Sequence, residues 1–363
     1  MTLPLPRTFP PMEAQLVDRL PSGDEWQYEP KWDGFRCLVH RDGESVDLMS
    51  KAGKPLTRYF PDVVESVRAV RARRFVVDAE IVVPIGDSLS FDDLLMRIHP
   101  AKSRVEKLAR ETPASVVVFD LLVDSRGRSL VTKPLTERRP ALEEFAAEFL
   151  ADVPRIHLSP ATTSPETVSK WMRSVGDGLD GIIAKRMDVP YASGDRTAMQ
   201  KVKNMRTADC VVGGFRYASK GKVVGSLLLG LYDGAGLLHH VGYTSSIKAA
   251  EKAELTRRLE KLVRPPGFTG QAPGGPSRWS TERSAEWQPL KPALVVEVQY
   301  DHFSGGRFRH GTAFVRWRPD KAPRQCTIEQ VEQEGRSAMR LLRAPNAGRL
   351  RRAIKAAAAR ERK

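Results

Sequence analysis

Cysteines are scarce in this sequence and long apolar runs are absent, and each absence excludes a class of protein. The three cysteines among 363 residues, Cys37, Cys210 and Cys326, are far apart and odd in number. They form neither a disulfide framework nor the spacing of a metal site, so we expect buried free thiols in a reducing cytosol. No window is long and apolar enough to span a bilayer, and the first residues, MTLPLP, lack the layout of a secretory signal. We therefore predict a cytoplasmic protein without a membrane partner.

A phosphate-binding loop of the Gly-Lys-Ser/Thr type is also absent, and so is any internal repeat. Gly213 and Gly214 fall inside an expected strand rather than in a turn before a helix. A protein that uses a nucleotide without this loop must hold the phosphates in another way.

Positive charge, in contrast, is abundant. Lys and Arg number 59 against 44 Asp and Glu, which gives a formal net charge of +15 and a pI near 9.9. Such an excess favours a polyanionic partner, because neutralised phosphates release condensed counterions. The alternative is a soluble protein that is simply basic; we predict a nucleic-acid partner and a location at the nucleoid. A hydrophobic content of 41% is enough for real cores, and the length favours two domains.

Residues 26–206 alternate short β-rich runs with helical patterns, which favours an α+β domain. The expected strands are 35–40, 45–50, 75–84, 115–123 and 181–185, and the expected helices are 62–72, 91–98, 139–150 and 166–175. The last helix has a complete start signal, with Ser164 as N-cap and Pro165 at the first helical position.

After Asp209 the pattern changes to five short strands with one helix, which is typical of a small Greek-key barrel of the oligonucleotide-binding (OB) type. The expected strands are 210–216, 224–232, 237–243, 294–300 and 312–318, and the expected helix is 249–263. Residues 264–292, with two tryptophans, indicate a long loop before the fourth strand. From Thr327 the chain is basic and helical in composition, which is typical of a solvated helix or arm that could grip DNA. We predict three regions: domains at 1–207 and 208–325, and a basic helical tail at 326–363.

The segment 31–36 (KWDGFR) pairs a potential nucleophile with polar neighbours. A lysine amine in a partly closed pocket can attack a phosphorus centre and hold the product covalently. Standing alone, Lys31 at a strand edge beside a glycine turn is more simply a solvated charge. Six further motifs follow it in the chain: SKAG at 50–53, VDAEIV at 77–82, VFDLL at 118–122, LDGIIAKR at 179–186, KVK at 201–203 and RWRPDK at 316–321.

The order and spacing of these seven motifs resemble the covalent nucleotidyltransferases, and within them the small bacterial ATP-dependent DNA ligases. The similarity covers about residues 26–323. It implies an α+β adenylation domain with antiparallel sheets and flanking helices, followed by an OB-fold β-barrel. It also implies ATP as the cofactor, together with Mg²⁺ or Mn²⁺.

The resemblance implies that Lys31 attacks the α-phosphate of ATP, which forms a phosphoramide-linked AMP and expels pyrophosphate. Because an ammonium cannot attack, the pKa of Lys31 must be lowered by partial burial and by neighbouring cations or the metal. The candidate cations, which also pair with phosphate oxygens, are Lys185, Lys201 and Lys203.

Other motif residues would bind the base, the ribose and the metal. Glu29 resembles the residue that accepts a hydrogen bond from the adenine amino group, and Phe119 the residue that stacks on the base. Arg36 would contact the ribose or the nick-side phosphate. Glu80 and Asp180 would supply hard oxygen ligands to Mg²⁺ or Mn²⁺. Without the family, Phe119 is equally a core residue, Glu80 an outward strand charge and Asp180 part of a plain turn.

The sequence departs from the family pattern at three places. Ala79 stands where Gly is common, which narrows the backbone conformations there but leaves Glu80 in place. Lys51 replaces Arg and loses the bidentate fork, so its phosphate contact is looser. Met199 and Gln200 precede Lys201 where an aromatic and an aliphatic residue are common, which affects local packing rather than the lysines.

In the second domain, Arg318, Asp320 and Lys321 would reach the pyrophosphate only when that domain swings over the site, about a hinge at 204–209. We predict a monomeric ATP-dependent DNA ligase that seals nicks in double-stranded DNA during repair, recombination or replication. Family-level partners are repair proteins such as Ku or a primase-polymerase. The alternatives are an RNA ligase or capping-type guanylyltransferase, against which the Arg318–Lys321 ending argues, and an inactive DNA-binding module.

Overall fold

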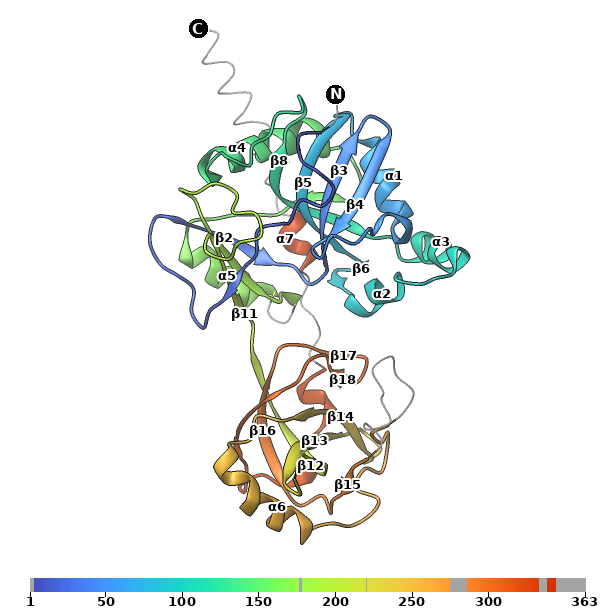
Figure 1. The fold of residues 1–363 in the computed structure, drawn as a ribbon. Helices are drawn as coiled ribbons and strands as arrows, with labels where there is room; N and C mark the ends of the chain where they lie inside the picture. The colour runs from blue at the N-terminus through green and yellow to red at the C-terminus, as the bar shows by residue number, and fades with distance from the viewer. Residues whose placement is uncertain (1–2, 176–177, 220, 275–285, 333–337, 344–363) are drawn as a thin grey trace. The chain divides into compact units, whose positions relative to one another are not determined.

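The computed structural model describes residues 3–175, 178–219, 221–274, 286–332 and 338–343. The chain folds into two units (Figure 1). Unit 1 consists of Met1–Asn204 and Gly335–Lys363, and unit 2 of Met205–Glu334. No helix in the described ranges is long and apolar enough to cross a membrane.

This division differs from the expected regions on the C-terminal side. Cys326 and Val331 are buried in the core of unit 2, so the barrel extends beyond residue 325. The chain then returns to unit 1, where Ala338 is buried. The rest of the expected basic tail, 344–363, lies outside the described residues.

The larger sheet of unit 1 has the strand order β4-β3-β5-β8-β9 and is antiparallel except between β8 and β9. Its strands are β3 (Phe35–Asp42), β4 (Ser45–Ser50), β5 (Arg74–Val82), β8 (Ser115–Val123) and β9 (Ile156–Leu158). Runs rich in valine form β5 and β8, because β-branched side chains pack well on a pleated surface. The first four strands confirm the sequence-based expectation.

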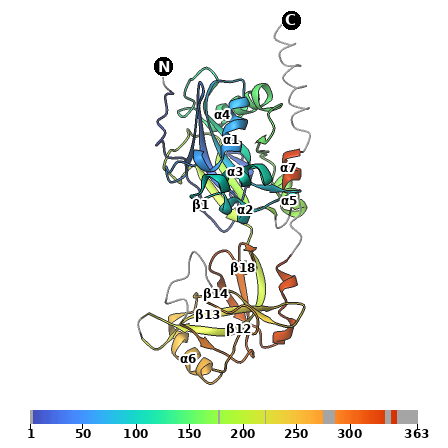
Figure 2. The same ribbon diagram turned by 90° about the vertical axis from the view of Figure 1, so that its right-hand side faces the viewer.

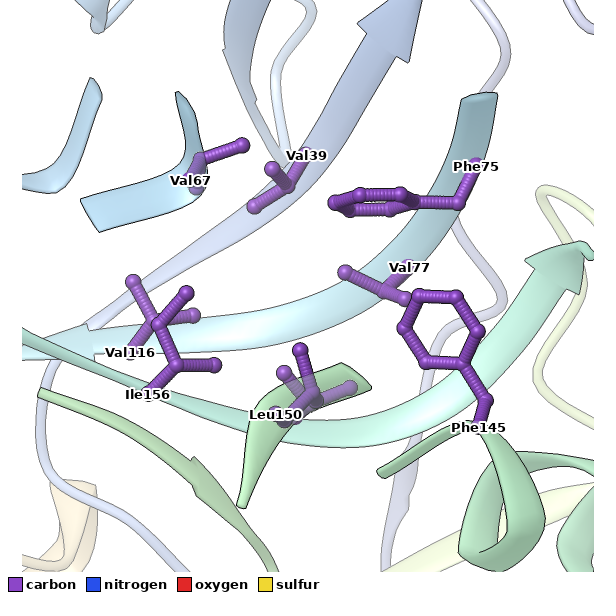
Figure 3. Close-up of a pocket in the computed structure, with 9 residues that line it drawn as sticks. Val39, Val67, Phe75, Val77, Val116, Phe145, Leu150 and Ile156 are labelled. Atoms are coloured by element: carbon purple, nitrogen blue, oxygen red, sulfur yellow. The ribbon is translucent and has the colours of Figure 1, made fainter. Parts of the chain in front are cut away.

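Helices cover one face of this sheet and create the main core of unit 1. The two helices involved are α1 (Pro61–Ala69) and α4 (Leu135–Phe145), the latter continued by a π-helical turn, Ala146–Leu150. The Phe75 and Phe145 rings meet here with centroids 5.2 Å apart. Figure 3 shows a small cavity in this core with apolar walls, lined by Val39, Val67, Phe75, Val77, Val116, Val118, Phe145, Leu150 and Ile156.

The smaller sheet of unit 1 has the order β1-β11-β10-β2. Its strands are β1 (Gln15–Leu16), β2 (Trp26–Lys31), β10 (Gly181–Arg186) and β11 (Met199–Lys203). Helix α5 (Pro165–Val175) packs on Tyr28, Ile182 and Ala184 of this sheet. Its predicted N-cap is confirmed, since Ser164 Oγ accepts a hydrogen bond from the Thr167 N–H at 3.2 Å.

Several elements of unit 1 are absent from the sequence-based expectation, among them β2, β11 and α3 (Lys102–Glu111). The strands β2 and β11 carry charged residues at alternate positions, which hides them from a search for apolar runs. Helix α3 buries only Val105, and its apolar period is short, since Leu108 and Ala109 alone continue it. The remaining described elements of this unit are α2 (Phe91–Met96), the hairpin β6 (Pro84–Ile85) and β7 (Ser88–Leu89), the short 3₁₀ turn Thr57–Tyr59 and α7 (Met339–Arg343).

Unit 2 is a five-stranded barrel with the order β14-β13-β12-β16-β19, which confirms the expected OB fold. Its strands are β12 (Arg206–Tyr217), β13 (Val224–Tyr232), β14 (Leu238–Thr244), β16 (Val295–Tyr300) and β19 (Ala313–Trp317). A bridge between Thr244 and Thr312 brings the two ends of the sheet together. Helix α6 (Lys252–Glu260) lies between the third and fourth strands in the chain, as expected. The short strands β15 (Gln288–Pro289), β17 (Phe303–Ser304) and β18 (Arg307–Phe308) and the 3₁₀ turns Ala249–Glu251, Pro323–Gln325 and Ile328–Gln330 complete the described elements of this unit.

The expected long loop before β16 is partly ordered against the barrel. Trp287 packs on Phe268 with ring centroids 5.5 Å apart, and both belong to the barrel core. The other tryptophan of this segment, Trp279, lies outside the described residues.

Candidate active site

One face of the smaller sheet carries several of the predicted site residues. Ile183 of β10 lies opposite Glu29 of β2 on one side and opposite Lys201 of β11 on the other. Because side chains alternate along a strand, Lys31 and Lys185 share this face. A pocket with about 720 Å³ of empty space lies here. The predicted residues that line it are Glu29, Lys31, Arg36, Lys51, Glu80, Phe119, Lys185 and Lys201.

Two glycines of the motifs allow this close packing. A Cβ on Gly34 would lie 2.2 Å from the carbonyl oxygen of Ile81, so only glycine lets the loop after Lys31 approach β5. Gly181 has φ +144° and a Cβ there would lie 2.0 Å from the carbonyl oxygen of Val202. It is the first residue of β10, which excludes the plain-turn interpretation of the Asp180 motif.

Lys31 forms an ion pair with Asp180 at the end of the pocket where β2 ends and β10 begins. The Lys31 side chain is 23% exposed and that of Asp180 is 8% exposed. Burial by itself lowers the pKa of Lys31, but attraction to Asp180 outweighs it, so the net shift of the pKa is upward. In the protein without nucleotide or metal the pKa of Lys31 is therefore raised, and the expected lowering by neighbouring cations or the metal stays a prediction for the loaded pocket. The reason for the raised pKa is the direct carboxylate contact, which the sequence does not reveal.

The lysine with a lowered pKa is Lys201. Burial lowers its pKa first, and the positive charges of Lys31, Lys51 and Lys203 lower it further. Lys203 lies two residues along the same strand, opposite Gly181. This end of the pocket therefore concentrates positive charge, as a site for a polyphosphate requires.

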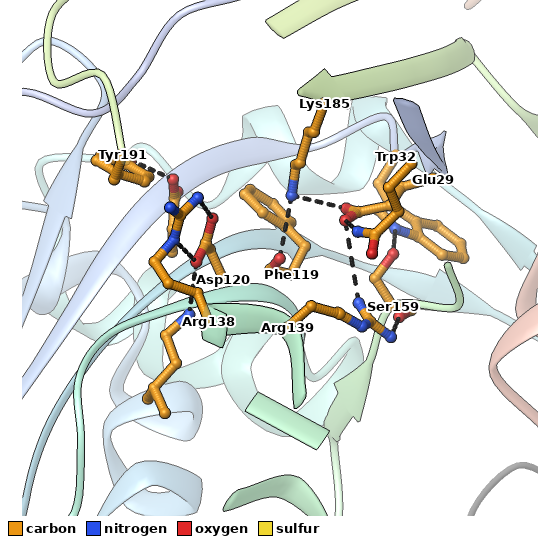
Figure 4. A network of polar contacts seen from close by, with 12 residues as sticks. Glu29, Trp32, Phe119, Asp120, Arg138, Arg139, Ser159, Lys185 and Tyr191 are labelled. Atoms are coloured by element: carbon orange, nitrogen blue, oxygen red, sulfur yellow. Dashed lines mark hydrogen bonds and ion pairs between the residues drawn. The ribbon is translucent and has the colours of Figure 1, made fainter. Parts of the chain in front are cut away.

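Lys185 lies at the other end of the pocket. Its ammonium donates hydrogen bonds to Glu29 Oε2 at 2.8 Å and to the Phe119 carbonyl oxygen at 3.0 Å (Figure 4). It lies 4.6 Å from the centre of the Phe119 ring, and the residue is 2% exposed. The sequence places Lys185 among the phosphate-binding cations, whereas its contacts in this structure are those of the predicted adenine pocket.

A buried polar network holds Glu29 in place, and the sequence analysis missed most of it. Gln27 Nε2 donates to Glu29 Oε1 at 2.8 Å, and Arg139 Nη1 lies 3.9 Å from the same oxygen. Arg139 also donates to the Ser159 carbonyl oxygen at 2.9 Å. Gln27 shares the strand and the face of Glu29, so the period of two along β2 is the signal that would have found it.

Arg36 is held by a second network beside Phe119. Its guanidinium donates to Asp78 Oδ1 at 3.0 Å and to Oδ2 at 2.6 Å, and the Tyr191 hydroxyl donates to Asp78 at 2.6 Å. The Arg36 guanidinium carbon lies 5.5 Å from the Phe119 ring centre. Asp78 stands two residues before Glu80 on β5, so the same period of two would have revealed this partner. A further buried pair nearby joins Arg138 and Asp120 with bonds of 2.9 and 3.1 Å.

Glu80 and Asp180 are the carboxylates available for a divalent cation. Desolvation raises the pKa of Glu80 to about 8, although Lys31 and Arg36 pull it down. Within the described ranges no three His, Cys, Asp or Glu side chains group as a metal cage. Two hard oxygen donors suit Mg²⁺, which usually keeps water ligands and binds substrate phosphates as well. The residues present thus fit a cation that is held jointly with a polyphosphate.

Lys51 reaches the pocket from the mouth. Its ammonium lies 3.1 Å from Glu13 Oε2, and the side chain is 49% exposed. Arg196 pairs with the same carboxylate at 2.9 Å. Among the pocket lysines, Lys31, Lys51 and Lys185 each pair with a carboxylate. Lys51 is the most exposed of these and is therefore the most weakly held.

The cations predicted on the second domain form their own cluster in unit 2. Arg318 donates two hydrogen bonds to Asp209, at 2.9 and 3.0 Å, and Lys321 donates one at 2.7 Å. Arg318 also pairs with Asp320 at 2.8 Å. Asp209, at the start of the barrel, is a partner that the sequence analysis did not assign.

An antiparallel α+β domain with a lysine in a charged pocket, joined to an OB barrel, defines the class of covalent nucleotidyltransferases. A family model described as ATP dependent DNA ligase domain matches residues 11–203. A second model, ATP dependent DNA ligase C terminal region, matches residues 220–321. The chain belongs to the ATP-dependent DNA ligase family.

Similar proteins agree with this assignment. DNA ligase C2 of Mycolicibacterium smegmatis is 44% identical over 353 residues, which covers 92% of this chain and 96% of the relative. DNA ligase C of Mycobacterium tuberculosis is 42% identical over 351 residues, with the same coverage of each chain. A solved structure from work on DNA binding with a minimal scaffold by Lig E DNA ligases has a TM-score of 0.52 at 16% identity. It covers 85% of this chain and 99% of that one, and it supports the fold alone.

Proposed function

We propose that this chain is an ATP-dependent DNA ligase that seals nicks in double-stranded DNA, with Lys31 as the nucleophile. The observation that carries the proposal is the layout of a single pocket. It brings Lys31 together with a buried acceptor and donor pair, Glu29 and Lys185, and with a group of cations around Lys201. A nucleoside triphosphate has the matching layout of a flat base at one end and negative charge at the other.

The Glu29 and Lys185 pair offers an acceptor and a donor that match the N6 and N1 positions of adenine. Adenine presents an N–H donor at N6 beside an acceptor at N1, and guanine presents an acceptor beside an N–H donor. The Glu29 carboxylate accepts hydrogen bonds and the Lys185 ammonium donates them, with 2.8 Å between the two groups. The base would stack on Phe119, which lies beside both groups.

In the first step the Lys31 amine attacks the α-phosphorus of ATP. The new bond joins Nζ to phosphorus, the bond to the β-phosphate oxygen breaks, and pyrophosphate leaves. Lys31 must first lose a proton, and its partner Asp180 is the nearest recorded acceptor. The cations around Lys201 and Lys51 would stabilise charge on the phosphates as it moves to the leaving group.

Glu80 and Asp180 would hold a Mg²⁺ or Mn²⁺ ion, which when bound supplies Lewis-acid stabilisation of the phosphate oxygens. Positive charge near the two carboxylates would weaken the hold of Asp180 on the Lys31 proton. Glu80, whose pKa lies at about 8 without a cation, would be the residue most changed by that charge.

In the second and third steps AMP passes to the 5′-phosphate at the nick, and the 3′-hydroxyl then displaces it to form the phosphodiester. Both are phosphoryl-type transfers, in which positioning and charge stabilisation supply most of the rate. With a net charge of +15, the protein would bind the DNA backbone with little sequence preference and a steep dependence on salt.

The role of unit 2 in the first step stays a prediction. Arg318 and Lys321 would assist the departure of pyrophosphate once they leave Asp209, in a closed state formed about residues 204–209. Action as a monomer at the nucleoid, in repair with Ku or a primase-polymerase, is also part of this proposal.

The test incubates the protein and Mg²⁺ with ATP or GTP labelled at the α-phosphate and follows transfer of label to the chain. We expect label from ATP alone, and we expect Lys31→Ala to abolish both labelling and nick sealing while DNA binding persists. Lys31→Arg is the matched control, because it keeps the positive charge beside Asp180 but removes the amine nucleophile. Labelling from GTP would favour a capping-type enzyme, and labelling that persists in Lys31→Ala would assign the nucleophile elsewhere.

A further inference from the structure

A short C-terminal helix, α7, packs against unit 1 next to the predicted nucleophile. Ala338, Leu341 and Leu342 belong to one apolar cluster with Trp32 and Leu179. The cluster also includes Val82 and Val117 from the larger sheet and Trp171 and Val175 from α5; Figure 2 shows α7 beside α5. Ala338 is 0% exposed and Met339 is 6% exposed, so this contact is a packed one.

Backbone and charged groups add to the contact. The Met339 N–H donates to the Asp87 carbonyl oxygen at 3.3 Å, and Arg340 lies 4.0 Å from the Asp87 carboxylate. Arg340 itself is 76% exposed and therefore contributes little. The apolar side chains supply most of the attachment.

Two residues of the cluster in which α7 is packed are chain neighbours of the proposed catalytic pair, Lys31 and Asp180. Trp32 directly follows Lys31, and Leu179 directly precedes Asp180. The Asp180 N–H donates to the Lys31 carbonyl oxygen at 3.2 Å, so the two backbones are joined at this point. A shift of Trp32 or Leu179 would therefore move both members of the Lys31 and Asp180 ion pair.

Trp32 connects α7 with the pocket itself. It lines the pocket and belongs to the α7 cluster, and it is 4% exposed. Its indole N–H donates to Ser159 Oγ at 3.0 Å, and Ser159 in turn accepts from Arg139, which lies beside Glu29 (Figure 4). The orientation of the indole is thus set by α7 on one side and by this polar network on the other.

A helix of five residues is too short to be stable alone, so α7 exists because it is docked. Its release costs few contacts and does not require unit 1 to unfold. The helix can therefore be docked or released, and a substitution in its apolar contact can shift the balance toward the released state.

We propose that docked α7 is a positioning element that holds Lys31 in line for attack on the α-phosphorus. This inference rests on the proposed function. Release of α7 would leave Glu29, Lys185 and Phe119 in place to bind ATP but would loosen Trp32 and, with it, the Lys31 backbone. Loss of docked α7 should therefore lower the rate of attack more than the affinity for ATP. The reason is that alignment of the Lys31 amine with the α-phosphorus stabilises the transition state and not bound ATP.

The test measures formation of the enzyme–AMP adduct by full-length variants in single turnover over a range of ATP concentrations. Ala338→Arg puts a guanidinium at a position that is 0% exposed, and Leu342→Asp is a milder second variant. Ala338→Ser is the conservative variant. Arg340→Ala is the matched control on the exposed side of the same helix.

We expect Ala338→Arg to slow the step at saturating ATP by about tenfold or more, with the KM for ATP changed less than about twofold. Ala338→Ser and Arg340→Ala should keep wild-type values. Acrylamide should quench tryptophan fluorescence more strongly in Ala338→Arg, because Trp32 and Trp171 become accessible to water.

Stronger quenching with a wild-type rate would overturn the proposal, and so would a rise in KM alone, which would assign α7 to the ATP pocket. If urea denaturation shows that Ala338→Arg is globally unstable, the same two readouts on Leu342→Asp decide the question. Failure of the proposed function is distinct, since the wild-type protein would then form no AMP adduct.

Discussion

A lysine–carboxylate pair occurs in each unit with nearly the same geometry and a different environment. In unit 1, Lys185 lies 2.8 Å from Glu29, and each side chain is 3% exposed. In unit 2, Lys321 lies 2.7 Å from Asp209, with side-chain exposures of 25% and 12%. Distance therefore does not distinguish the pairs, but contact with water does. The buried pair, Lys185 and Glu29, is a fixed part of its pocket. In the more exposed pair, Lys321 can leave Asp209 and bind a phosphate with little loss of free energy.

Removal of the carboxylate from the buried pair should have the largest effect. Glu29→Ala leaves the Lys185 ammonium without its carboxylate at a position 2% exposed. We expect the free energy of unfolding of unit 1 to fall by about 3–5 kcal/mol, measured by urea denaturation. Adding Lys185→Met should recover part of the loss, because it removes the buried charge. If Glu29→Ala lowers the free energy of unfolding by less than about 1 kcal/mol, the buried pair contributes no more to stability than an exposed one.

Acid should distinguish the units through His40 in unit 1 and His240 in unit 2. Burial lowers the pKa of His240 in unit 2 to about 3 and that of His40 in unit 1 to about 4. Both stay neutral when folded and gain a proton when unfolded, so stability is complete above pH 6.5 and falls as the pH drops toward the folded pKa.

Between pH 6.5 and 4 the free energy of unfolding of unit 2 falls as the pH drops. We expect His240→Gln to make this fall smaller by about 3 kcal/mol. His40→Gln should do the same for unit 1 by a smaller amount, and the exposed His310→Gln is the control. The measurement is urea denaturation at several pH values. Equal pH slopes for the His240 variant and the wild type would contradict the expected effect of burial.

Removal of the carboxylate from the more exposed pair should cost less. Asp209→Ala removes one partner of Lys321 and of Arg318, but Lys321 can be solvated and Arg318 keeps Asp320, so we expect a loss of about 1–2 kcal/mol in the stability of unit 2. Glu297→Ala, which removes the partner of the 63% exposed Arg316, is the matched control in the same barrel. A loss as large as that of Glu29→Ala would show that burial does not decide the difference.

The smallest effect is expected at the exposed mouth of the pocket. Lys51→Arg restores the bidentate fork at a side chain that is 49% exposed. We expect the KM for ATP to fall by about twofold, with stability unchanged within about 0.5 kcal/mol. The measurement is the ATP dependence of adduct formation, and Lys54→Arg, also exposed, is the control. An unchanged KM would show that Lys51 does not contact the phosphates.

Much of the fold could be predicted from local patterns. The start of α5 follows from Ser164 and Pro165, and most strands of the larger sheet and the barrel follow from their apolar runs. Strands β2 and β11 could not be found in this way, because they line the pocket and their charged side chains interrupt the apolar run. Helix α7 falls in the stretch expected to be helical, but its packing on unit 1 could not be predicted, because its partner residues come from segments more than a hundred residues away.

The sequence by itself determined the order of the motifs, and through that order the family, the lysine proposed to attack and the barrel that follows it. Tertiary structure decided what each charge is next to. It pairs Lys31 with Asp180 and raises its pKa, lowers the pKa of Lys201 instead, and turns Lys185 toward Glu29. The physical reason is that motif identity is a local property of the chain. A pKa and the strength of an ion pair depend instead on burial and on charges that only folding brings within a few ångströms.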